Sequence, residues 1–309
     1  MSKLTRREIL LAKIETTYNT DPTPDGSNAI LVENLAWSHE GARMVERPAI
    51  RRSLAPLQQI FAGTLRQMTF DVEIKGSGTA DTPPELGPLL RACGMAEDIV
   101  TGTSVTYQPA SENQESITFY YFEDGTRYKV TGARGNVTSD LSTGGVGKLS
   151  FTFTGHVDDG TDTTAPAPTF VDTVPPPLIN VPFTVGSFLA VTQQLQFDLS
   201  NTVATPPSIS AGDGYGEIIV TNRDVSGSFD PEAELKANQD FIQDWKDGVT
   251  KAIDTGVIGN SAGNQYQITF PKAHYREVSP GDRDSIRTYD MSFGAAESTT
   301  DDEVSIVFT

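Results

Sequence analysis

The sequence predicts a mainly β fold built from two tandem β-sandwich or barrel modules, each with one short α-helix. Apolar and polar residues alternate in many runs; Leu149, Phe151 and Phe153, for example, alternate with Ser150 and Thr152. Side chains on a strand point to opposite sheet faces in turn, so such a run is typical of a strand with one buried face. The 27 glycines and 19 prolines fit a turn-rich β protein, and 309 residues allow two domains.

The first 30 residues are expected to form an N-terminal arm. Ser2 or Thr5 is a candidate cap for a short helix that continues through Lys13. A first module is expected over 31–157. Its predicted strands lie at 29–37, 69–75, 116–123, 127–134 and 146–155. Its predicted helix runs from Pro83 to Ala92, with proline at its start and Gly94 beyond its end.

Residues 41–66 show little alternation, and we interpret them as a long loop with a helical turn near 54–61. This loop is rich in basic residues, although the chain carries a net charge of −18. Its arginines are Arg43, Arg47, Arg51, Arg52 and Arg66. A solvated charged loop is one interpretation. The other is a docking element for acidic surface on a neighbouring copy, because complementary charge sets register and steers encounter.

Residues 158–180 are interpreted as a Pro- and Asp-rich linker, whose composition does not support a core. A second module is expected over 181–309. Its predicted strands lie at 188–199, 215–221, 223–229, 264–270, 285–294 and 303–309. A helix is predicted over 231–247, with Asp230 as its N-cap. Its expected apolar stripe consists of Leu235, Phe241, Ile242, Trp245 and Val249.

The pattern of the second half resembles that of the first. Residues 128–155 and 266–294 each give strand, turn and strand, and each is preceded by a strand and a helix that begins with proline. Residue identity between the halves is low, so the similarity is one of pattern. We interpret it as internal duplication; the alternative is two β domains whose similar order is coincidental.

No arrangement of residues in the sequence supports catalysis or a cofactor. The three histidines, His39, His156 and His274, lack the spacing of a helix-borne zinc site, and no phosphate-binding loop or nucleophile elbow is present. Cys93 is the single cysteine, which excludes an intrachain disulfide. The acidic balance argues against a groove that binds nucleic acid. We therefore predict neither an enzyme nor a metal site, and no membrane-spanning segment.

Three segments resemble tail tube proteins of long-tailed phages with non-contractile tails. They are 15–34, which contains Tyr18-Asn19-Thr20-Asp21-Pro22, then 65–76 and the helix over 84–94. The resemblance covers about the first 155 residues, and the second half only by pattern. It implies sandwiches that join into a ring, stacked rings around a DNA channel, and a long loop that reaches the adjacent ring. Two fused modules per chain imply trimeric, pseudo-hexameric rings.

This resemblance implies a virion protein that is assembled in the host cytoplasm, with itself, the tape measure, the terminator and distal tail proteins as partners. Genomic DNA would pass without specific binding. Four carboxylates on the solvated faces of predicted strands are candidates for the channel lining: Asp71, Glu73, Asp198 and Glu217. Two alternatives remain, namely a terminator or distal-tail ring protein, and a β-sandwich binding or adhesin module.

Overall fold

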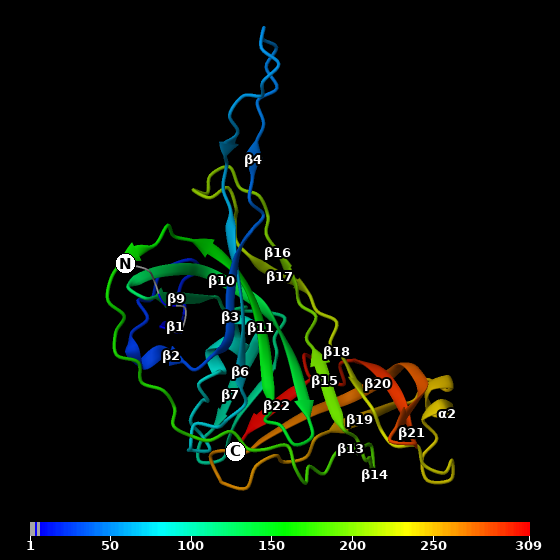
Figure 1. The fold of residues 1–309 in the computed structure, drawn as a ribbon. Helices are drawn as coiled ribbons and strands as arrows, with labels where there is room; N and C mark the ends of the chain where they lie inside the picture. The colour runs from blue at the N-terminus through cyan, green and yellow to red at the C-terminus, as the bar shows by residue number, and fades with distance from the viewer. Residues whose placement is uncertain (1–3, 5–6) are drawn as a thin grey trace.

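The computed structural model describes residue 4 and residues 7–309, and its fold is mainly β (Figure 1). The first half contains β1 (Glu8–Ile14), a 3-10 turn (Gly26–Asn28), β2 (Ala29–Ile30), β3 (Glu33–Glu40), β4 (Met44–Val45), β5 (Ile60–Phe61), β6 (Leu65–Glu73), α1 (Gly87–Ala92), β7 (Met95–Val100), β8 (Ser104–Pro109), β9 (Ile117–Glu123), β10 (Thr126–Ser142), β11 (Lys148–Val157) and β12 (Thr161–Asp162).

The second half contains β13 (Thr184–Val185), β14 (Phe188–Leu189), β15 (Gln194–Asp198), β16 (Thr202–Ala204), β17 (Ile219–Asn222), β18 (Ser226–Phe229), α2 (Phe241–Lys246), β19 (Thr250–Asp254), β20 (Tyr266–Arg283), β21 (Ile286–Ala295) and β22 (Ser305–Phe308). The predicted mainly β fold with a short helix in each half is confirmed. The strands β7, β8 and β19 lie where the sequence pattern predicted none.

The two halves pair their strands in the same antiparallel order. In the first half the order is β2, β1, β9, β10, β11, β6, β3. In the second half it is β14, β13, β19, β20, β21, β18, β15. The strands also occupy corresponding places along the chain, and each helix lies in the corresponding connection. The likeness between the halves, which the sequence pattern indicated, therefore extends to the topology.

Hydrogen-bonded strands join the two halves into one sheet. The long strand β10 pairs with β9 through its first part and with β15 through Thr138–Ser142, so β15 carries the sheet from one half into the other. A second link pairs β8 with β22. Residues 158–180, predicted as a linker, contain the short strand β12, which pairs with β10.

A continuous hydrophobic core underlies both halves. In the first half Phe70 packs against Phe151 and Phe153, with ring centroids 5.8 and 6.0 Å away. In the second half Phe229 packs against Phe293 at 6.0 Å. Burial of each phenylalanine side chain stabilises the folded state by about 1.5–3 kcal/mol, so the apolar faces of the alternating strands supply most of the stability.

The prediction of a helix before Lys13 is wrong. Residues 8–14 form β1, and Leu10, Leu11 and Ala12 are buried in succession. The strand lies between β2 and β9. Both of its faces are covered, because Leu10 and Ala12 belong to one apolar cluster and Leu11 to another. A continuous apolar run suits such a strand as well as it suits a helix, and here the neighbouring strands decide.

The predicted helix over 231–247 shrinks to α2, whose N-cap is Asp240 rather than Asp230. Residues 231–233 are extended along β21, where Tyr289 N–H donates to the Pro231 carbonyl. The Asp230 carboxylate instead accepts from the backbone N–H groups of Gln193 and Gln194. The expected apolar stripe does not form. Of its five residues Phe241 is buried, whereas Leu235 is 75% exposed.

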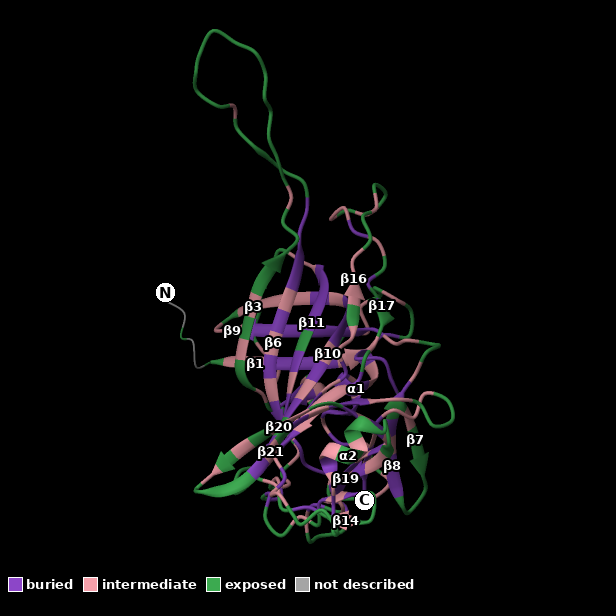
Figure 2. Cartoon of the chain, turned by 90° about the vertical axis from the view of Figure 1, so that its right-hand side faces the viewer, coloured by how far each residue is buried: buried purple, intermediate pink, exposed green. Residues whose placement is uncertain are grey.

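Two long loops connect equivalent strands in the two halves. The first, which we call the projecting loop, comprises residues 41–64 between β3 and β6, and extends far from the body (Figures 1 and 2). It contains the two-stranded ladder of β4 and β5, so the helical turn predicted near 54–61 is absent. The second, the anchored loop, comprises residues 199–225 between β15 and β18 and contains the ladder of β16 and β17.

Candidate functional site

One face of the sheet is polar across the junction of the two halves, and we call it the polar face. It consists of the side chains that alternate with the buried phenylalanines. One row of paired residues runs through Asp71, Ser150, Thr138, Asp198 and Ser226. The next row runs through Glu73, Lys148, Asp140, Gln196, Ser228 and Ser292. Carboxylates and hydroxyls dominate both rows.

Hydrogen bonds fix the carboxylates of this face. Asp71 accepts from the Ser150 hydroxyl at 2.5 Å and from Asn34 Nδ2 at 2.7 Å. Asp198 accepts from Asn136 Nδ2 at 2.7 Å. Lys148 donates to Glu33 Oε2 at 2.6 Å, and this bond raises the pKa of Lys148. The result is an ordered surface on which fixed negative charge exceeds positive charge.

Three of the four predicted lining carboxylates, Asp71, Glu73 and Asp198, lie on this polar face. Glu217 lies elsewhere. The predicted strand over 215–221 begins only at Ile219, and the Glu217 carboxylate pairs with Arg134 at 2.9 Å. Glu217 belongs to the attachment of the anchored loop.

The projecting loop exposes both charge and apolar surface. Arg47, Arg51 and Arg52 are exposed near its outer end. Large apolar side chains beside them are exposed as well, and they are Met44, Val45, Ile50, Leu54, Ile60 and Phe61. Several exposed large apolar side chains on one loop are typical of an interaction site.

The other two predicted docking arginines pack against the body of the chain, whereas Arg51 donates within the loop to the carbonyls of Ala55 and Pro56. Arg43 lies at the base of the loop, donates to the Gly214 carbonyl at 3.0 Å and stacks 4.0 Å over the ring of Tyr215. Arg66 lies on β6 and is 4% exposed. Its guanidinium lies 4.3 Å over the ring of Trp37, and burial lowers its pKa. Both arginines fix the base of the projecting loop.

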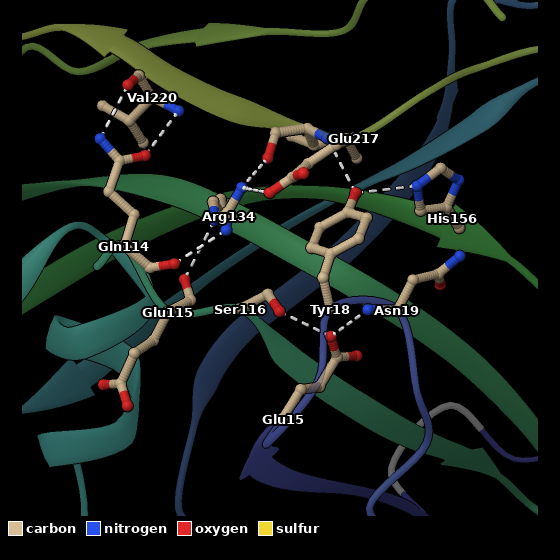
Figure 3. Close-up of polar contacts among 11 residues, drawn as sticks. Glu15, Tyr18, Asn19, Gln114, Glu115, Ser116, Arg134, His156, Glu217 and Val220 are labelled. Carbon is tan, nitrogen blue, oxygen red and sulfur yellow. Dashed lines mark hydrogen bonds and ion pairs between the residues drawn. The ribbon is translucent and has the colours of Figure 1, made fainter. Parts of the chain in front are cut away.

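The anchored loop is held against the first half by a buried arginine (Figure 3). Arg134 on β10 donates to the carbonyls of Glu115 at 3.2 Å and Gln114 at 2.8 Å, and to the carbonyl of Ile218. The side chain of Gln114 bonds both backbone groups of Val220. Residues 217–220 are thus fastened to β10 and to the segment before β9.

A second set of bonds ties the same loop to the segment after β1 and to β11. The Tyr18 hydroxyl accepts from Ile218 N–H at 2.8 Å and lies 2.9 Å from His156 Nε2. His156 Nδ1 lies 2.6 Å from Asp213. Burial raises the pKa of Tyr18 to about 12. Both ring nitrogens of His156 are engaged, so this trio acts as a clamp between the halves.

The buried Glu15 supports this clamp from below (Figure 3). Its carboxylate accepts from the hydroxyls of Ser116 at 2.6 Å and Thr118 at 2.5 Å, and from the N–H groups of Asn19 and Gly132, both at 2.7 Å. Four donors satisfy a charge that would be costly to bury alone. These residues were not predicted from the sequence, because the bonded groups lie up to 200 positions apart and no local spacing reveals them.

The described residues contain no helix with the length and apolarity that a membrane crossing requires. Over the same part of the chain, no three His, Cys, Asp or Glu side chains gather closely enough to hold a metal ion. Cys93 is buried, and burial raises the pKa of its thiol.

Comparison with known proteins agrees with the sequence and the fold. The comparison with curated proteins gave no match. A family model described as phage tail tube protein matches residues 5–305, which is nearly the whole chain. This match spans both halves of the sheet, the projecting loop and the anchored loop. The chain therefore belongs to the phage tail tube protein family and is a structural component of the virion tail.

Proposed function

We propose that copies of this chain assemble side by side into rings, and that the rings stack around a channel through which DNA passes. The observation that carries this proposal is the polar face, which continues across the junction of the two halves. A sheet that already extends from one half to the next has the form of a segment of a larger barrel. Closing that barrel with further copies would satisfy its remaining strand edges.

The polar face is the proposed channel lining. Asp71, Glu73 and Asp198 would present fixed negative charge to the phosphates of the DNA. The serine and threonine hydroxyls would keep the channel surface hydrated. Like charge repels, so DNA would slide without adhering. We leave Glu217 out of the proposed lining, because it lies in the anchored loop, where it pairs with Arg134, rather than on the strands of the polar face.

The projecting loop is the proposed contact between rings. Its exposed apolar side chains would be buried on the next ring, while Arg47, Arg51 and Arg52 would meet acidic surface there. A chain with net charge −18 repels its own copies, so a basic tip gives the stack an attractive contact.

Because the two halves share one strand order, we infer two fused tube modules per chain and three chains per ring. Each ring would then contain six modules in a pseudo-hexamer. The tail would be of the non-contractile type, with tape measure, terminator and distal tail proteins as further partners and assembly in the host cytoplasm. No catalysis is proposed, since the Tyr18, His156 and Asp213 trio is fully engaged in fastening the anchored loop.

Electron microscopy of the purified protein tests this function. We expect hollow tubes that grow in length with protein concentration, and a cryo-EM map with Asp71, Glu73 and Asp198 at the bore. Single rings that never stack would favour a terminator or distal-tail ring protein. Monomers at every concentration, with or without phage partners, would favour a binding module and contradict the proposal.

A further inference from the structure

We propose that the join between neighbouring copies repeats the join inside the chain, so that β3 of one copy adds to the outer half of β20 of the next, with Ser38 opposite Ser279. The inference rests on the proposed ring assembly and specifies its strand pairing. It follows from the equivalence of the two halves, because the internal join shows how one module meets the next.

The internal join pairs the outer half of β10 with β15. Thr138 lies opposite Asp198, and Ser139 lies opposite Phe197. Leu199 N–H donates to the Val137 carbonyl, so Val137 turns its backbone groups toward the join. In an antiparallel pair the backbone N–H and C=O groups of successive residues point alternately toward and away from the neighbouring strand. Thr138 and Asp198 are therefore a non-hydrogen-bonded pair, in which the Cα atoms lie about 4.5 Å apart.

Buried residues that lie opposite one another on neighbouring strands show which residue of β20 corresponds to each residue of β10. Each half has a row of three buried or half-buried apolar residues that cross the long strand, its hairpin partner and the strand beyond. The rows are Val137, Phe151 and Phe70 in the first half, and Val278, Met291 and Phe229 in the second. Val278 therefore corresponds to Val137, and Ser279 corresponds to Thr138.

The residues Phe70 and Phe229 of these rows also show which residue of β3 corresponds to each residue of β15. Trp37 lies opposite Met68, two positions before Phe70, and Phe197 lies opposite Gly227, two positions before Phe229. Trp37 therefore corresponds to Phe197. One position further on, Ser38 corresponds to Asp198.

The outer half of β20 has the bare edge that this pairing requires. Among the described residues, the positions after Tyr275 pair with β21 and with no other strand. Tyr289 N–H donates to Pro231, away from β20, so its opposite residue Pro280 also turns its backbone outward. Val278 and Asp282 share that direction. Val137, the counterpart of Val278, turns its backbone groups toward the internal join in the same way.

Pro280 limits what this edge can accept. Proline within sheets is confined to edge strands, where it removes one donor and hinders indiscriminate pairing. Its counterpart Ser139 also departs from a plain ladder, because Phe197 N–H donates to the Ser139 hydroxyl at 3.0 Å. The internal join at Ser139 and the proposed join at Pro280 thus depart from the regular backbone ladder at corresponding positions.

The exposure of β3 fits a strand that lacks its second neighbour. Among the described residues β3 pairs with β6 alone, whereas β15 lies between β10 and β18. Both strands alternate in burial. Leu195 and Phe197 are buried, and the corresponding Leu35 and Trp37 are half-buried. An added β20 from another copy would cover Trp37 as β10 covers Phe197.

Disulfide trapping tests the pairing. In the variant with Ser38→Cys and Ser279→Cys, the non-hydrogen-bonded pair would bring the Cα atoms to about 4.5 Å, within the range of a disulfide. We expect oxidation of assembled protein to link successive chains into covalent oligomers up to the size of the ring on a non-reducing gel. Native Cys93 is buried, so it does not compete.

The matched control combines Ala36→Cys with Ser279→Cys, which shifts the register by two residues to a diagonal separation of about 7–8 Å. We expect at least tenfold less cross-linking from this pair. Microscopy of both variants under reducing conditions separates the two proposals. Tubes that form without cross-linking of Ser38→Cys to Ser279→Cys, or equal cross-linking of both pairs, would overturn this seam and leave the tube function standing. Absence of rings and tubes from the unmodified protein would overturn both.

Discussion

The projecting loop and the anchored loop occupy the same place in the two halves but have opposite surroundings. Each leaves an equivalent strand, contains a two-stranded ladder and returns to the equivalent next strand. The anchored loop finds its partners within the chain, where Arg134 and Tyr18 satisfy its backbone. The projecting loop has exposed arginines and apolar side chains along its outer part.

Equivalent topology therefore does not set the role of a loop. The base of the projecting loop rests on the anchored loop, where Gly63 approaches the backbone of Asp213 so closely that a Cβ would lie 1.9 Å from its carbonyl oxygen. Gly63 also has φ of +109°, which favours glycine. The anchored loop thus orients the base of the projecting loop.

The largest effect is expected from charge reversal on the projecting loop. Replacing Arg47, Arg51 and Arg52 with glutamate should abolish ring stacking, because their side chains lie on the exposed loop and would then repel an acidic neighbour. Folding should be unchanged by circular dichroism. Negative-stain microscopy provides the readout. The control replaces Lys236, Lys246 and Arg287 with glutamate, which alters net charge equally; normal tubes from the loop variant would exclude its docking role.

Removal of the buried arginine should destabilise the anchored loop. Arg134→Ala leaves the carbonyls of Gln114, Glu115 and Ile218 without their donor, and we expect a loss of about 3 kcal/mol in the free energy of unfolding. Urea denaturation measures this loss, and limited proteolysis should cut within 199–225. Arg134→Lys, which keeps the charge, should lose less. Native stability and protease resistance in Arg134→Ala would show that the loop is held by other contacts.

Matched apolar truncations compare the two loops directly. Ile218→Ala in the anchored loop should cost about 2–5 kcal/mol, because Ile218 is 0% exposed. Leu54→Ala in the projecting loop should stay within about 0.5 kcal/mol, because Leu54 is 104% exposed in the single chain. Thermal unfolding of the unassembled variants measures both. Similar losses at the two positions would mean that the projecting loop folds back onto its own chain.

The smallest effect is a pH dependence from Tyr18. Burial raises its pKa to about 12, above the value near 10 expected when unfolded. The stability that this shift contributes is present below pH 10 and is lost as the pH rises toward 12. The decrease in urea midpoint between pH 8 and pH 11 should therefore be smaller in Tyr18→Phe than in the unaltered protein. An unchanged decrease would show that Tyr18 does not titrate at the loop.

Local pattern predicted the strands whose two faces differ. The alternation of Phe70 and Val72 with Asp71 and Glu73 predicted β6 and its polar side, because one face of that strand is dry. It failed at β1, where Leu10 and Leu11 are both buried, and at α2, where the segment after Asp230 pairs with β21 instead of coiling. In both places a neighbouring strand overrides local preference.

Local pattern was enough to predict the β class, the likeness of the halves and the solvated faces of the strands that carry Asp71, Glu73 and Asp198, and composition gave the acidic charge. These strand properties depend on neighbouring residues, because side chains alternate between the two faces of a strand with a period of two. Pattern alone did not predict that the sheet passes from β10 to β15, that Arg134 and Glu15 anchor one loop, or that the other extends away from the body. Those outcomes depend on hydrogen bonds and ion pairs between residues distant in the chain, and only the folded chain brings such residues together.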